Sequence, residues 1–145
     1  MMSISSASSA ASDQPLLPWM RYLLRFAGTY NLLVGTSMVL FYHEGFKMFG
    51  LERPALLLPV QLNGILIALF GAGYHMVASH PREHRGVLLL GWWSKALGSV
   101  LGTYYVVLGK LPPAFLAILF LSDVIYLPLF WKILKRLKSA TSTSD

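Results

Sequence analysis

Four long apolar segments constrain the fold of this chain more than any other feature of its sequence. They cover about residues 18–42, 55–78, 86–108 and 114–133. Each has roughly the ~20 residues that an α-helix needs to cross the ~30 Å hydrocarbon layer of a bilayer. Because the connecting segments are short, consecutive helices are expected to be antiparallel neighbours. We therefore predict an all-α polytopic membrane protein, with four antiparallel transmembrane helices in one bundle spanning residues 17–138.

Composition supports the same class of protein. Of the 145 residues, 55% are hydrophobic and 12% are charged, which is about half the charge content of an ordinary soluble domain. The remaining residues, 1–16 and 139–145, are predicted to be disordered tails. The first tail is rich in Ser and Ala and lacks the basic and apolar regions of a signal peptide. The chain has no cysteine, which excludes disulfides, thiolate catalysis and Cys-ligated metal centres.

The net charge of +6 reflects membrane topology. Basic residues flank the apolar segments and form no single surface stripe, so we predict no nucleic-acid partner. The side shared by both termini and the second connection carries Arg21, Arg25, Arg82, Arg85, Lys132, Lys135, Arg136 and Lys138. The opposite side carries only Lys47, Arg53 and Lys110. The positive-inside rule then predicts that both termini are cytoplasmic. Residues 45–51, GFKMFGL, are expected to lie on the outer surface as a short amphipathic turn.

Two charged residues interrupt the predicted spans. Lys95 lies in the third span and Asp123 in the fourth. At 1.5 Å per residue, both lie roughly 15 Å from the cytoplasmic side. An unpaired charge at the centre of a membrane helix costs ~2.5 to 3.5 kcal/mol. Because the two residues lie at matching depths on antiparallel neighbours, we predict that they form an ion pair inside the bundle.

Other polar side chains are expected near the same depth. The candidate binding site comprises Lys95, Asp123, Asn31, Gln61, Asn63 and Tyr126. Small residues share helical faces with several of them, in the series Gly28–Asn31–Gly35, Gln61–Gly64–Ala68–Gly71 and Gly91–Lys95–Gly98–Gly102. Such stripes allow close helix approach and also occur as simple packing contacts in membrane bundles, so both interpretations of the amides and glycines stay open. Pro128 is expected to kink the fourth span one turn beyond Asp123.

The sequence contains no recognisable catalytic or metal-binding motif. His43 lies on one side of the predicted membrane and the other three histidines near the other, so no pair of axial haem ligands shares a depth. The segment HMVASHPREH, residues 75–84, groups three histidines with Glu83. Pro81 interrupts their helical spacing, and no H-E-x-x-H is present. We therefore predict no catalytic residue, no metal site and no evident cofactor.

Four segments carry a resemblance to a known group of proteins. YNLLVG, FGAGYH, SKALGSVLG and SDVIYLPLF, which begin at Tyr30, Phe70, Ser94 and Ser122, resemble those of small uncharacterised four-helix bacterial membrane proteins. That group carries a lysine where Lys95 stands and an aspartate where Asp123 stands. The layout is more distantly similar to DoxX-like proteins, some of which are linked to quinone-dependent oxidation. The resemblance implies a multi-pass protein of the bacterial inner membrane. The chain departs from the closer group at Ser122, where asparagine is usual, and at Leu127, where an aromatic residue is common.

Three functional hypotheses follow from the buried charged pair. The first is a binding or accessory membrane protein, in which Lys95 and Asp123 either hold the bundle together or bind the polar head group, such as a quinone carbonyl, of a quinone-like or lipid-like small hydrophobic molecule. The second is a proton or small-solute transport element, in which the ion pair opens as the solute passes. The third is the membrane subunit of a redox complex, which would need a protein partner. A homo-oligomer is compatible with each hypothesis.

Overall fold

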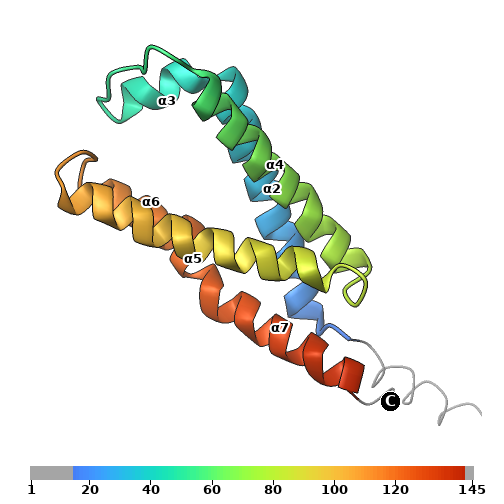
Figure 1. The fold of residues 1–145 in the computed structure, drawn as a ribbon. Helices are drawn as coiled ribbons and strands as arrows, with labels where there is room; N and C mark the ends of the chain where they lie inside the picture. Colours follow the sequence, from blue (N-terminus) through green and yellow to red (C-terminus); the bar gives the residue numbers. More distant parts are fainter. Residues whose placement is uncertain (1–14, 143–145) are drawn as a thin grey trace, which may run out of the picture.

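The computed structural model describes residues 15–142, which are helical apart from short connections and contain no strand. In chain order the elements are α2 (Pro18–Leu40), α3 (Tyr42–Met48), α4 (Leu58–Ser79), α5 (Arg85–Val107), α6 (Phe115–Leu119), the π-helix η1 (Phe120–Val124) and α7 (Tyr126–Ser142) (Figure 1). Three stretches are long and apolar enough to cross a membrane: α2, α4 and Phe115–Ser139. The predicted all-helical membrane class is confirmed at this level. The structure does not by itself establish four spans, because α5 does not reach the same apolar character.

Two predicted helix boundaries shift for local reasons. Pro59 has no N–H to donate to the carbonyl of residue 55, so a helix through that position would lose a backbone hydrogen bond. The helix α4 therefore begins at Leu58, with Pro59 in its first turn, where no intrahelical donor is required. The first predicted span divides at Phe41, whose non-helical backbone separates α2 from α3. No residue of α3 is buried.

The structure also differs from the predicted tail boundaries. Leu16 is only 2% exposed and belongs to the hydrophobic core. The adjacent Pro15 carbonyl accepts a 3.0 Å hydrogen bond from Nε of Arg136. At the other end, α7 continues to Ser142 and covers part of the predicted C-terminal tail. The remainder of both predicted tails lies outside the described residues.

The helices are arranged as two arms (Figure 1). The first arm is α2 packed along α4, the most extensive helix contact in the structure. Gly28 and Gly71 lie back to back at this contact, and a Cβ built at either one would stand under 3 Å from the other's carbonyl oxygen. This confirms that the small residues of these two helices permit close backbone approach. The second arm consists of α5 lying against α6, η1 and α7.

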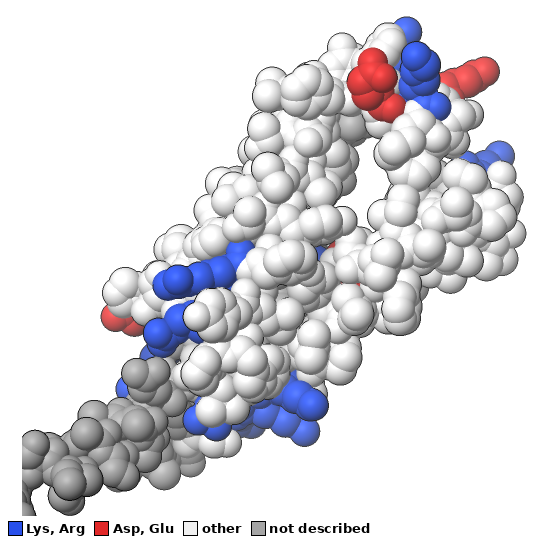
Figure 2. All heavy atoms as spheres, turned by 180° about the vertical axis from the view of Figure 1, so that it is seen from behind, with Lys and Arg blue, Asp and Glu red and all other residues white. Residues whose placement is uncertain are grey.

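The arms join at one end of the molecule, which we call the core end; it contains the first turns of α2, the connection between α4 and α5, and α7. The buried cluster there draws on all four long helical segments and includes Leu16, Leu24, Val77, Leu88, Phe130, Ile133 and Leu137. Toward the other end, the loop end formed by α3 and residues 108–114, the arms diverge (Figure 1). The two arms touch again at the loop end, where the rings of Phe49 and Phe115 pack edge to face with their centroids 6.1 Å apart. Figure 2 shows an opening between the arms, with charged atoms of both signs at its inner end.

Candidate functional site

A π-helical turn positions Asp123. The amide N–H of Ile125 donates to the carbonyl of Phe120, five residues earlier, at 3.0 Å. The turn ends shortly before Pro128, which has no N–H to offer the carbonyl of Val124. The predicted irregularity is therefore present, but it lies over Asp123 itself instead of one turn beyond it. Single π-turns inside helices are frequent at functional sites because they change where the side chains point.

Lys95 and Asp123 form the predicted ion pair. Nζ of Lys95 donates to Oδ1 of Asp123 at 2.8 Å and to the Ser122 carbonyl at 2.8 Å. The Lys95 side chain is 7% exposed and that of Asp123 is 23% exposed. The ammonium also lies 5.1 Å from the centre of the Tyr126 ring, within cation–π range. Lys95, Asp123 and Tyr126 are thus brought together, as the sequence predicted.

A tyrosine of the first arm packs beside the site. Tyr74 on α4 is only 1% exposed. Its hydroxyl lies against Gly91, one turn before Lys95, at a position where a Cβ on residue 91 would be 2.5 Å away. Sequence reasoning missed Tyr74, although the glycine at position 91 indicated that a bulky side chain packs against this face of α5.

The three predicted amides lie at different places along the first arm. Asn31 is 7% exposed and lies on the face of α2 that contacts α4, between Gly28 and Gly35. Nε2 of Gln61 donates to the Val39 carbonyl at 3.5 Å, and Asn63 is exposed. Gln61 precedes Tyr74 by 13 residues, or about 20 Å along the helix axis. The amides of α4 therefore stand near the loop end, away from the ion pair.

Ser99 is a further polar residue that sequence reasoning did not select. It lies one turn after Lys95 on α5 and is 8% exposed. Its hydroxyl has no hydrogen-bond partner among residues 15–142. Buried polar groups in proteins are nearly always hydrogen-bonded, so an orphaned hydroxyl beside an ion pair calls for a physical explanation.

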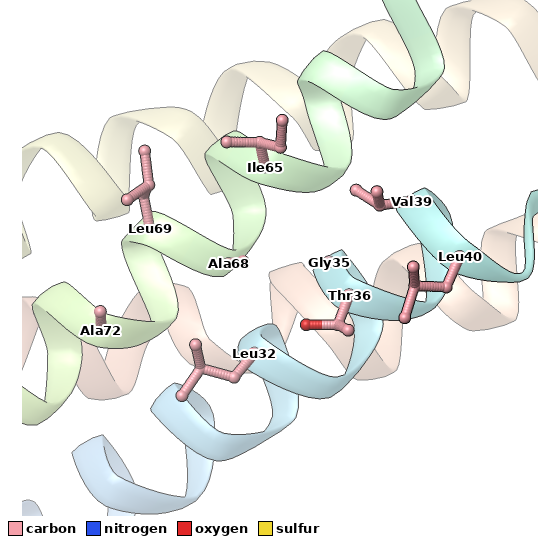
Figure 3. A pocket seen from close by; sticks show the side chains of 9 residues that line it. All are labelled: Leu32, Gly35, Thr36, Val39, Leu40, Ile65, Ala68, Leu69 and Ala72. Carbon is pink, nitrogen blue, oxygen red and sulfur yellow. The ribbon is translucent and has the colours of Figure 1, made fainter. Parts of the chain in front are cut away.

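A separate apolar groove lies between α2 and α4 (Figure 3). It has a volume of about 330 Å³ and is lined by apolar residues, such as Leu32, Val39 and Ile65, together with the hydroxyl-bearing Thr36. The groove offers surface for an acyl chain but has no ionisable group among its lining residues. The ion pair is therefore the stronger candidate for recognising a polar group.

The fold and this centre define a helical protein with three stretches suited to crossing a membrane and one buried Lys/Asp ion pair. No family model, no curated protein and no solved structure matches the chain. Within residues 15–142, no three His, Asp or Glu side chains are grouped so that they could hold a metal ion. The chemistry of the ion pair itself must therefore guide any assignment of function.

Proposed function

We propose that this chain is a four-span membrane protein that binds a small hydrophobic molecule between its two arms, with the molecule's polar head against Lys95 and Asp123. The observation that carries the proposal is the location of this pair. The ion pair is buried within the second arm, Tyr74 of the first arm packs against α5 one turn from Lys95, and an opening separates the arms toward the loop end (Figure 2). Apolar walls that end in a few polar groups are the usual composition of a small-molecule site.

The fourth span in this proposal is α5. Its 23 residues give it a length of about 34 Å, enough to cross a bilayer. It lies against Phe115–Ser139, which is apolar enough to span, and only residues 80–84 separate it from α4. Lys95 lowers the apolar character of α5, but Asp123 neutralises that charge at 2.8 Å. The ion pair thus removes the main obstacle to inserting α5.

Topology can be tested by single-cysteine labelling, because the chain has no native cysteine. A Cβ added at Gly45, Gly86 or Gly98 would meet nothing within 4 Å, so each position tolerates Cys. We expect a membrane-impermeant maleimide to label Gly86→Cys only from the cytoplasmic side and Gly45→Cys only from the other side. Gly98→Cys, in the middle of α5, should stay unlabelled from both sides. Rapid labelling of Gly98→Cys in intact membranes would show that α5 does not span.

Binding can be tested by native mass spectrometry of protein released gently from its membrane. We expect a bound small molecule in the wild type that is lost in Asp123→Asn. Asn63→Ala is the matched control, because this amide is exposed and lies far along α4 from the ion pair. It should retain the molecule. A bare protein in all three samples would leave the ion pair with a purely structural role and would refute the binding function.

A further inference from the structure

Lys95 has little hydrogen-bonding capacity left for an occupant of the site. An ammonium group carries three N–H bonds. Two of them are used by Oδ1 of Asp123 and the carbonyl of Ser122, each at 2.8 Å. The Tyr126 ring, 5.1 Å away, covers the ammonium on a further side. With its side chain only 7% exposed, Lys95 gives an occupant little access to its remaining N–H bond.

Asp123 is the accessible member of the pair and has acceptor capacity to spare. Its side chain is 23% exposed, about three times the fraction of Lys95. Oδ2 accepts a hydrogen bond of 3.2 Å from the Ser122 hydroxyl, longer than is usual for a bond to a carboxylate. An ionised carboxylate accepts about four hydrogen bonds. The most exposed polar group of the pair is therefore the carboxylate of Asp123, which accepts hydrogen bonds. A molecule that binds to it must supply a hydrogen-bond donor.

Ser99 supplies the complementary group. Its hydroxyl is buried and has no partner within the described part of the chain. It lies four residues after Lys95, about 6 Å further along the helix axis. Residues four apart share a helix face, so Ser99 stands on the face of α5 that carries Lys95. A serine hydroxyl can donate and accept, so it can donate to the oxygen of an occupant while Asp123 accepts a hydrogen bond from that occupant's hydroxyl.

We infer that the occupant of this site carries a neutral hydroxyl head group, which donates to Asp123 and accepts from Ser99. The inference rests on the proposed binding function. A carbonyl head accepts only, so it would engage Ser99 and leave the remaining acceptor positions of Asp123 unused. An ammonium head would bring a second cation to a carboxylate that Lys95 already neutralises, at a desolvation cost with little return. The reduced, hydroxyl-bearing form of a quinone-like molecule thus fits better than its oxidised, carbonyl-bearing form.

The inference can be tested with two probes that differ in one donor. The probes are 4-decylphenol and 4-decylanisole, which share ring and tail, while the methyl ether lacks the O–H. Saturable binding is measured by native mass spectrometry of protein in lipid nanodiscs over a series of probe concentrations. We expect the phenol to bind at least tenfold more tightly than the ether. Equal affinities, or tighter binding of the ether, would overturn the hydroxyl assignment and leave the binding function standing.

Variants separate the two contacts. The double variant Lys95→Met/Asp123→Asn removes the carboxylate without stranding a charge, so it should reduce the phenol's advantage over the ether to less than threefold. Ser99→Ala should weaken both probes by a similar factor, because each has an oxygen that accepts from the serine. An advantage of the phenol that survives in the double variant would overturn the assignment of Asp123 as its acceptor. If neither probe binds saturably to the wild type, the proposed binding function fails together with the inference.

Discussion

Removing one member of the buried ion pair is expected to destabilise the protein, because the charge that remains loses its neutralising partner. Asp123→Asn leaves the ammonium of Lys95, 7% exposed, without a neutralising charge. An unpaired charge at the centre of a membrane helix costs ~2.5 to 3.5 kcal/mol, so we expect the free energy of unfolding to fall by about 3 kcal/mol. Lys95→Met leaves Asp123, which is 23% exposed and keeps the Ser122 hydroxyl bond. Its expected loss is smaller, about 2 kcal/mol.

The double variant decides whether mutual neutralisation is the cause. Lys95→Met/Asp123→Asn strands no charge, so its loss should stay near 2 kcal/mol, from the hydrogen bonds that it forfeits. The coupling energy between the two sites is then about 3 kcal/mol. Reversible unfolding in mixed micelles, followed by far-UV circular dichroism, measures all four proteins. Thr103→Val is the matched control on α5, because it removes a 2.7 Å hydrogen bond to the Ser99 carbonyl and no charge. Losses that simply add in the double variant would refute the reasoning.

Two further perturbations test the arrangement of the arms. Gly35→Ala should lower the free energy of unfolding by at least about 2 kcal/mol, because its Cβ would collide with the backbone at Gly64. The control Gly98→Ala places a Cβ that meets nothing within 4 Å, so it should be neutral or slightly stabilising. The same unfolding assay compares the two variants, and equal effects would contradict the glycine contact. Phe49→Ala removes the ring contact with Phe115 at the loop end, which is worth about 0.5 to 1.5 kcal/mol. It should speed dissociation of bound 4-decylphenol in stopped-flow exchange, and an unchanged dissociation rate would exclude this contact as a barrier to exit.

The sequence was most informative where one physical cost dominated. Burying a lone charge in a membrane helix is expensive enough that the depths of Lys95 and Asp123 sufficed to predict their contact, and the structure confirms it. Helix α5 matched its predicted range within one residue at each end, since no proline interrupts it. By contrast, the depth argument placed Gln61 near the ion pair, although the structure leaves it in the first turn of α4. An amide costs much less to bury than a charge, so its depth alone does not constrain its partner.

The opening between the arms could not be predicted from helix periodicity. Glycine stripes on α2 and α4 produced the expected close contact, but the similar series on α5 divides in space. Gly91 faces Tyr74, Gly102 faces Leu119, and Gly98 faces no neighbour within 4 Å. A one-dimensional pattern cannot show which of several small residues on a helix meets a partner. The π-turn at Asp123 was likewise out of reach, because Pro128 predicts an irregularity but does not fix its position.

The proposed binding function assigns stability and recognition to different parts of this molecule. The glycine contact of α2 with α4 and the buried cluster at the core end hold the helices together. Buried ion pairs add little stability compared with apolar residues of similar size, so under this proposal the pair of Lys95 and Asp123 contributes mainly through recognition. At the loop end, the ring contact of Phe49 with Phe115 is worth only about 0.5 to 1.5 kcal/mol. The proposal therefore predicts that a bound molecule exchanges with the bilayer by separating the outer parts of the arms, while the ion pair and the core stay intact.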